Sequence, residues 1–177
     1  MTTFISVGNG KKPFYRLLNN LEEIYSLLPK PVIVQRGNTP FKSDNMIIYD
    51  FIEQNLFRKY ISQSKILIMH GGAGSLIQAI ENNKVPIIFP RLKKYDEIID
   101  DHQLELCNRL YQQKKIFLVK EFGSLKEEII KIDKLGYDQL NKNNLNNKNN
   151  KISSILKYVI NNYKDLSNDK IFNLIQR

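Results

Sequence analysis

The sequence predicts a protein of the α/β class, in which helices cover both faces of a mostly parallel sheet. Short apolar runs rich in β-branched residues alternate along the chain with segments whose apolar residues recur at helical spacing. In addition, three of the eight glycines fall within residues 71–74, between an apolar run and a helical segment. The order strand, glycine loop, helix, strand is typical of parallel α/β sheets.

The first predicted elements are a strand, a helix and two further strands. FISVGN is an apolar run that ends in a glycine, and PFYRLLNNLEEIYSLL follows it with apolar residues at helical spacing. Pro13 suits the opening of that helix. PVIVQRG and NMIIYDF are short, apolar and bounded by turn formers, which is typical of buried strands.

The alternation continues as helix, strand, helix, strand, helix, strand and helix. These segments are NLFRKYISQS, KILIMH, residues 75–83, VPIIFP, HQLELCNRLYQQKK, IFLV and SLKEEIIKIDK. We therefore predict one α/β domain over residues 1–136. Residues 137–150 form a low-complexity asparagine and lysine tract, which predicts a linker, and residues 151–177 show helical spacing again, which predicts a C-terminal helical segment.

Composition limits the classes of function. The 177 residues, 42% of them hydrophobic, can build one core. No run approaches the roughly 18 to 20 apolar residues of a membrane-spanning helix, and the N-terminus lacks a signal-peptide pattern, so a cytoplasmic location is expected. Cys107 is the only cysteine, which excludes an intramolecular disulfide. The net charge of +9 is compatible with nucleic acid, an anionic membrane or an anionic ligand, but without a recognition-helix pattern no nucleic-acid partner is expected.

The glycine loop suggests a phosphate site. Beyond the carboxyl end of a parallel strand, Gly71, Gly72 and Gly74 let a ligand approach the backbone, and the following helix directs free N–H groups at an anion. Ser75 can cap that helix or donate to a phosphate oxygen. The alternative is a tight turn whose glycines only allow close packing. The P-loop and the dinucleotide fingerprint require other residues or another position, so neither explains the loop.

The segment HGGAGSLIQAIENNKVPIIFPR, followed by DDHQLELCNRL, resembles the C-terminal, donor-binding half of the family 28 glycosyltransferases. Within that family it is most similar to the small split subunits of the Alg13-like and PssE-like types. ISVGNGKKPFYRLL and DFIEQNLFRKYISQSKILIMHGG match the family in the same order, so the resemblance covers residues 4–119.

The resemblance implies a Rossmann-like domain, half of a GT-B architecture, that binds a UDP-sugar as donor substrate and needs no cofactor. A separate, membrane-associated Alg14-like subunit would supply the acceptor half and hold this chain at the inner face of the membrane. The implied reaction is transfer of a hexose to a lipid-linked saccharide in exopolysaccharide or capsule biosynthesis. The alternative is a non-catalytic subunit that stabilises such a partner.

The resemblance also implies site residues. Those matching donor-nucleotide contacts are Gly8, Asn9, Phe51, Ile52, Gly71, Gly72, Gly74, Ser75 and Gln78. The pair Phe51 and Ile52 corresponds to backbone that faces uracil, and the other positions up to Ser75 correspond to diphosphate contacts. His102 and Gln103 match positions near the donor sugar. Many relatives carry a ribose-binding glutamate at the place of Ala79, so ribose recognition here is lost or passes to Gln78.

His70 ends the strand before the glycine loop and is a candidate base, because imidazole titrates near neutral pH. The alternative, which we favour, is a strand-end residue that shapes the loop, while the partner side supplies the base. The two histidines are far apart in sequence and form no ligand motif, so no metal is expected. Arg91, Lys93 and Lys94 are candidates to stabilise the UDP leaving group.

Overall fold

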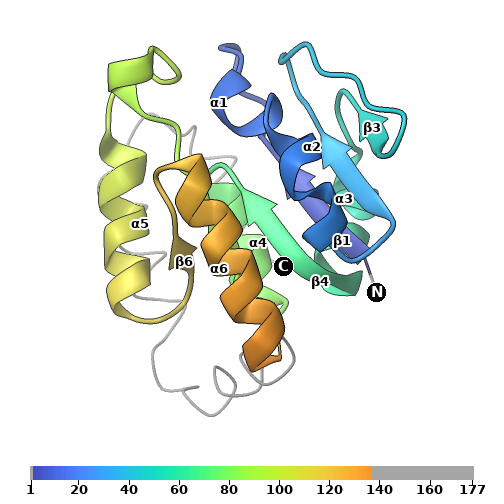
Figure 1. Cartoon of the computed structure of the whole chain (residues 1–177). Helices are drawn as coiled ribbons and strands as arrows, with labels where there is room; N and C mark the ends of the chain where they lie inside the picture. Colours follow the sequence, from blue (N-terminus) through green and yellow to red (C-terminus); the bar gives the residue numbers. More distant parts are fainter. Residues whose placement is uncertain (1, 137–177) are drawn as a thin grey trace.

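A six-stranded sheet forms the centre of the computed structural model, which describes residues 2–136 (Figure 1). The strand order is β3-β2-β1-β4-β5-β6, and every pairing between neighbours is parallel. The strands are β1 (Thr2–Ser6), β2 (Val32–Gln35), β3 (Ile47–Tyr49), β4 (Ser64–Met69), β5 (Ile87–Ile88) and β6 (Phe117–Leu118). The predicted fold class is confirmed.

Helices lie on both faces of this sheet. They are α1 (Tyr15–Leu18), α2 (Leu21–Ile24), η1 (Tyr25–Leu27), α3 (Gln54–Gln63), α4 (Ala73–Glu81), η2 (Lys93–Tyr95), α5 (His102–Gln112) and α6 (Phe122–Leu135). In Figure 1, α1, α2 and α6 lie in front of the sheet, with α3 and α4 behind it.

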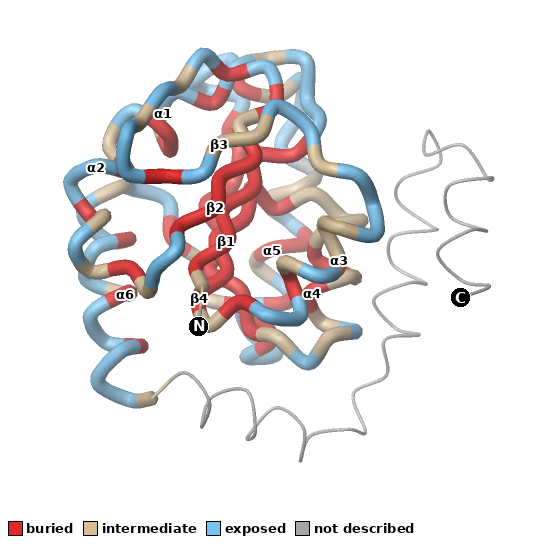
Figure 2. Tube along the Cα trace, turned by 90° about the vertical axis from the view of Figure 1, so that its right-hand side faces the viewer, coloured by how far each residue is buried: buried red, intermediate tan, exposed pale blue. Residues whose placement is uncertain are grey.

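Two apolar clusters fill the space between the sheet and its helices. Ile66 and Ile68 of β4 pack with residues of α1, α2 and α6, whereas Leu67 and Met69 pack with residues of α3, α4 and α5. This alternation follows from the two-residue period of a strand. Figure 2 shows the result, a continuous buried path through β2, β1 and β4. Strands buried on both faces explain why these runs are almost wholly apolar.

β2 and β3 lie on one side of β1 in the sheet, and β4, β5 and β6 lie on its other side, so that β1 and β4 are neighbours. The backbone N–H of His70 donates to the carbonyl of Ser6 over 3.2 Å, so the loops after both strands leave the sheet together. In open parallel sheets, such a switch point at the carboxyl edge is where ligands bind. The fold therefore brings the loop after Ser6 and the glycine loop after Met69 to one place.

Three details differ from the sequence prediction. The segment after Pro13 forms α1, α2 and η1 instead of one helix, because asparagines interrupt it: Asn20 Nδ2 donates to the carbonyl of Arg16 over 3.4 Å and competes with the helical pattern. β3 is an edge strand, exposed to half-buried, and not the buried strand expected from its composition. α4 begins at Ala73, two residues early. The predicted linker at 137–150 and helical segment at 151–177 lie outside the described residues.

Candidate functional site

The imidazole of His70 lies between the two loops of the switch point. A Cβ atom added to Gly8 would lie 2.3 Å from His70 Cε1, and one added to Gly72 would lie 2.3 Å from His70 Nε2. Gly8 also has a φ of +73°, which L side chains rarely adopt. Both glycines are therefore required for the loops to close on the histidine ring, and the predicted residues Gly8 and Gly72 contact the same imidazole.

The other two glycines of the loop differ from each other. Gly71 has a φ of +90°, and a Cβ there would meet Cys107 Sγ at 3.0 Å and Ile88 Cγ2 at 3.2 Å, so packing explains this glycine. Gly74 lies in the first turn of α4, and no atom lies within 4 Å of a Cβ placed on it. Glycine costs a helix about 0.5 to 1 kcal/mol relative to alanine. Neither packing nor backbone conformation accounts for Gly74, whereas a ligand close to the backbone would.

The first turn of α4 presents hydrogen-bond donors at this place. The helix begins with the bond from Leu76 N–H to the carbonyl of Gly72, at 3.0 Å. The preceding N–H groups, those of Ala73, Gly74 and Ser75, have no intrahelical carbonyl to bind. Together with the helix dipole they favour an anion. The arrangement fits a phosphate group, and the absence of a side chain at Gly74 keeps the approach open.

His70 is held neutral by its surroundings. Burial, and to a lesser extent the charge of Arg91, lower the pKa of His70 from 6.5 to about 4. The side chain is 9% exposed, and its Nδ1 forms no hydrogen bond among the described residues, although the nearby Ser6 carbonyl slightly opposes the fall in pKa. A group with this pKa is a weak base at neutral pH, and its ring is enclosed by glycines. The geometry favours the loop-shaping role over catalysis.

A polar chain fixes the loop after β1. Gly8 N–H donates to Ser6 Oγ over 3.2 Å, Ser6 Oγ donates to Gln35 Oε1 over 3.4 Å, and Gln35 Nε2 donates to Asn9 Oδ1 over 2.9 Å. Gln35 is the last residue of β2 and is only 2% exposed, whereas Asn9 is exposed. Sequence reasoning missed Gln35. The available signal was a glutamine ending an otherwise apolar strand.

Arg91, which follows β5 in the chain, anchors the same loop. Its Nη1 donates to the carbonyl of Lys12 over 2.8 Å and its Nη2 to that of Val7 over 3.1 Å, and its guanidinium stacks 4.6 Å from the ring centroid of Phe14. Burial lowers its pKa, which nearby Glu97 partly offsets. The guanidinium is thus used by backbone carbonyls, so the expected role as a direct partner of the leaving group does not fit Arg91.

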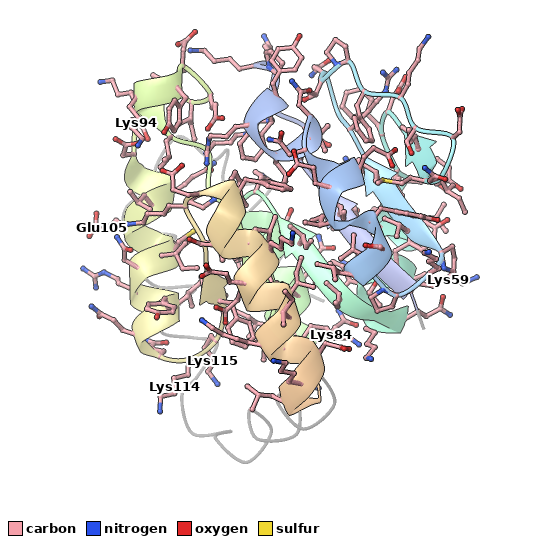
Figure 3. All side chains as sticks on the ribbon, viewed as in Figure 1. Lys59, Lys84, Lys94, Glu105, Lys114 and Lys115 are labelled. Carbon is pink, nitrogen blue, oxygen red and sulfur yellow. The ribbon has the colours of Figure 1, made fainter. Side chains whose placement is uncertain are left out.

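Lys93 and Lys94, the other two candidate cations, are exposed on η2. Lys94 Nζ lies 3.8 Å from Glu121 Oε1 and 4.5 Å from the ring centroid of Tyr95. Figure 3 shows Lys94 at one end of α5, with Lys114 and Lys115 at the other end. Lys93, Lys94 and Lys114 are exposed, as expected for a solvated basic surface, whereas Lys115 is buried.

The remaining predicted residues follow β3 or lie on α4 and α5. Phe51, just beyond the end of β3, is 53% exposed, and Ile52 is half-buried. Gln78 and Gln103 are both half-buried, and each has an Oε1 that is buried without a hydrogen bond among the described residues. His102 begins α5, but its side chain is not among those described.

Ala79 is fully buried in the apolar cluster beneath α4. No side chain at that position would face a ligand without disturbing the core. The neighbouring Gln78, one residue further round the helix, is half-buried, and Glu81 at the end of α4 is exposed.

A cavity of about 480 Å³ lies beside the loop after β1, and it does not include the glycine loop. Its lining residues are Lys12, Pro13, Tyr15, Arg16, Tyr95, Asp96 and Glu97. Arg16 and Glu97 form a buried ion pair there, with Nη2 2.7 Å from Oε2. Among residues 2–136 there is no cluster of three or more side chains able to hold a metal ion. The helices described are also all too short or too polar to cross a membrane.

Comparison with curated proteins gives two partial matches. The chain is 24% identical over 104 residues to the human UDP-N-acetylglucosamine transferase subunit ALG13, covering 56% of this chain and 9% of that protein. It is 32% identical over 69 residues to the protein of the same name from Candida albicans, covering 39% of this chain and 22% of that protein. The chain therefore corresponds to a small part of the length of either relative.

Solved structures show the same fold. The chain superposes on a glycotransferase of kitacinnamycin (TM-score 0.57, 13% identity), on the calicheamicin glycosyltransferase CalG4 (0.54, 12%) and on Acinetobacter baumannii MurG (0.55, 16%). Each match covers 78% of this chain and 37%, 37% and 42% of the respective neighbour. Sequence identities this low show the fold alone, which is the Rossmann-like type expected.

A match to the sequence pattern of a known family shows the family of this chain. Residues 25–159 match the glycosyltransferase family 28 C-terminal domain, so the match extends over most of the chain, including the glycine loop, α4 and β5. The predicted resemblance began earlier, at residue 4, and ended earlier, at residue 119. On this match, and on the parallel sheet with its glycine loop at the switch point, the chain belongs to the glycosyltransferase family 28 C-terminal domain family.

Proposed function

We propose that this chain is the donor-binding subunit of a UDP-sugar glycosyltransferase. The observation that carries the proposal is Gly74: it opens the first turn of α4 to a ligand, at the switch point of a family 28 domain, with no packing reason to be glycine. A diphosphate placed there meets free backbone N–H groups and the positive end of the helix dipole. Gly8 and Asn9 approach it from the loop after β1.

The other donor contacts follow from the residues around this edge. Phe51 and Ile52 flank the uracil through their backbone, and Gln78 takes the ribose hydroxyls. Gln103 and His102 are assigned to the donor sugar. The buried, unpartnered Oε1 atoms of Gln78 and Gln103 support these assignments, because a buried amide oxygen normally has a donor.

The reaction is sugar transfer to a hydroxyl group. The acceptor oxygen attacks the anomeric carbon, the bond from that carbon to the β-phosphate oxygen breaks, and UDP leaves with the electron pair. The N-terminal turn of α4 stabilises the negative charge that develops on UDP. We assign the base that accepts the hydroxyl proton to the partner side and not to His70, because His70 is buried and its pKa is lowered to about 4.

A partner subunit is part of the proposal. The two curated relatives are named as subunits of a transferase, and this chain matches 37% of the length of each of two structural neighbours. An Alg14-like, membrane-associated subunit supplies the acceptor half, binds a lipid-linked saccharide and holds this chain at the inner face of the membrane. The acceptor belongs to exopolysaccharide or capsule biosynthesis.

A second candidate is a non-catalytic subunit that stabilises its partner. The alanine at position 79, where many relatives bind ribose, favours it. The two candidates differ in donor affinity, since only the first requires UDP to bind this chain or the pair.

Ligand-observed NMR with UDP, with ADP as the control nucleotide, tests the proposal. Wild-type protein should bind UDP in preference to ADP, and Gly74→Asp should abolish binding because a carboxylate would occupy the phosphate position. The same titration on the pair co-expressed with its partner follows. If neither the chain nor the pair binds UDP, the donor-binding function is wrong and the stabilising role replaces it.

A further inference from the structure

Gln35 is a buried polar residue beside the loop after β1, and the role of its side chain is unexplained. It ends β2, it is 2% exposed, and both ends of its amide are used: Oε1 accepts from Ser6 Oγ, and Nε2 donates to Asn9 Oδ1. A buried amide is costly unless it is hydrogen-bonded, so an apolar residue would be the simpler way to end this strand. Its hydrogen bond to Asn9 links it to an exposed residue.

The hydrogen-bond chain sets the direction of the Asn9 amide. Ser6 Oγ accepts a hydrogen bond from the N–H of Gly8 and donates one to Gln35 Oε1, so Gln35 presents Nε2 to Asn9. Asn9 Oδ1 is then occupied, and the Nδ2 group, with two N–H donors, remains for a ligand. Asn9 is exposed and adjoins Gly8, which lies against the glycine loop through His70. Donors at this place suit phosphate oxygens.

We infer that Gln35 is a positioning residue for the donor diphosphate: it holds Asn9 Oδ1 so that Asn9 Nδ2 faces the phosphate. The inference rests on the proposed function and deepens it, because Gln35 itself is buried and touches no ligand. It acts only through Asn9, and only on the diphosphate part of the donor.

The experiment compares UDP, UMP and uridine on four variants by ligand-observed NMR titration. Gln35→Met keeps the length of the side chain without its polar atoms, and should weaken UDP binding by about three- to tenfold, the worth of one hydrogen bond. Uridine binding should stay unchanged. Asn9→Ala should give a similar loss, and the double variant no greater loss than Asn9→Ala alone. Gln35→Glu, which can only accept, should turn Asn9 Oδ1 toward the phosphate and weaken UDP more than Gln35→Met.

Ser64→Ala is the control for general loss of stability. Ser64 is 1% exposed at the opposite end of the sheet, where its Oγ donates to the carbonyl of Tyr60, and its loss should leave UDP affinity unchanged. Thermal melting checks that each variant is folded, and Gln35→Glu, a near-isostere, carries the test if Gln35→Met does not fold.

The outcomes are separable. Three results would show that the positioning role is wrong while the donor-binding function stands, provided that wild-type protein binds UDP. They are an unchanged UDP affinity in Gln35→Met, an equal loss of uridine affinity in that variant, and a double variant whose loss of UDP affinity is the sum of the two single losses. If wild-type protein and its pair bind no UDP, the proposed function fails first and the positioning role falls with it.

Discussion

At the residue scale, the glycines around His70 have different structural roles. Gly8 and Gly72 make room for the imidazole, and Gly71 adopts a positive φ against Cys107 and Ile88. Gly74, like Gly123 in α6, has no atom within 4 Å of an added Cβ. Glycine therefore serves packing at three positions of the site, and under the proposed function the fourth is open to a ligand.

Replacing Gly74 by alanine separates stability from binding. The added Cβ meets no protein atom, so Gly74→Ala should raise the free energy of unfolding by about 0.5 to 1 kcal/mol through helix propensity. It should also weaken UDP binding, because the methyl group enters the phosphate space. Urea unfolding and UDP titration measure the two effects. Gly123→Ala is a matched control, since Gly123 lies in the first turn of α6 with equally open space: it should stabilise without affecting UDP. Unchanged UDP affinity in Gly74→Ala would count against a phosphate site at the first turn of α4.

The pKa of His70 predicts a dependence of stability on pH. The folded-state value of about 4 lies below the ordinary 6.5, so the unfolded chain binds the proton more tightly than the native protein does. The contribution of the neutral imidazole to stability is complete above about pH 6.5 and is lost as the pH falls toward 4. The loss amounts to about 2 to 3 kcal/mol.

Urea unfolding of wild-type protein and of His70→Gln between pH 7.5 and 4.5 measures this contribution. Glutamine does not titrate, so the difference between the two free energies of unfolding should change with pH in the direction given, while effects of carboxyl groups cancel. Parallel pH profiles for the two proteins would show that His70 is protonated equally in the folded and unfolded states.

At the element scale, the loop after β1 is held from two sides of the sheet. Gln35 of β2 binds its exposed end, and Arg91, which follows β5, binds the carbonyls of Val7 and Lys12. The loop itself lacks regular structure between Ser6 and α1. Side chains from neighbouring strands thus supply the order that the loop sequence does not.

Arg91→Lys should release this loop. A lysine ammonium lacks the planar fork that reaches several carbonyls, and carbonyls left without a donor in a buried place are costly. We expect a loss of about 2 to 4 kcal/mol in the free energy of unfolding and weaker UDP binding. Hydrogen exchange of the amides at residues 7–13 should also become faster. Lys93→Met, at an exposed neighbour, should change none of these quantities. Unaltered exchange in Arg91→Lys would mean that other contacts hold the loop.

At the scale of the whole molecule, the strand order decides which loops form the site. β1 and β4 are adjacent in the sheet although 57 residues lie between the end of β1 at Ser6 and the start of β4 at Ser64. The loops that follow β1 and β4 therefore meet at the carboxyl edge, with those after β2 and β5 on either side. The chain matches 37% and 42% of the length of two structural neighbours, and under the proposed function turnover needs a second subunit.

Membranes containing this chain and its partner should transfer sugar from a radiolabelled UDP-sugar to lipid-linked acceptor, whereas either subunit alone should not. Gly74→Asp should remove turnover and keep co-purification with the partner, because the substitution lies at the donor site. Turnover by the partner alone at the rate of the pair would instead identify this chain as a stabilising subunit.

Much of the fold followed from patterns that are local in the sequence. Strand and helix types were predicted for every main element because buried strands and amphipathic helices have distinct periods. The break of the helix at Asn20 and the exposure of β3 were not predicted, because side-chain competition for one carbonyl and the place of a strand at the sheet edge are not periodic features. The family assignment, made from ordered motifs, is confirmed.

The sequence by itself determined the α/β class, the glycine loop between a strand and a helix, and the family, since each depends on residues close together in the chain. Only the tertiary structure decided that Gly8 and Gly72 enclose His70, that Gln35 holds Asn9, and that Arg91 anchors a loop instead of facing the leaving group. These contacts join residues that are far apart in sequence, and they exist because the parallel sheet places β2, β1, β4 and β5 side by side. Burial and hydrogen bonding across that edge, which no local pattern encodes, assign each polar residue its role.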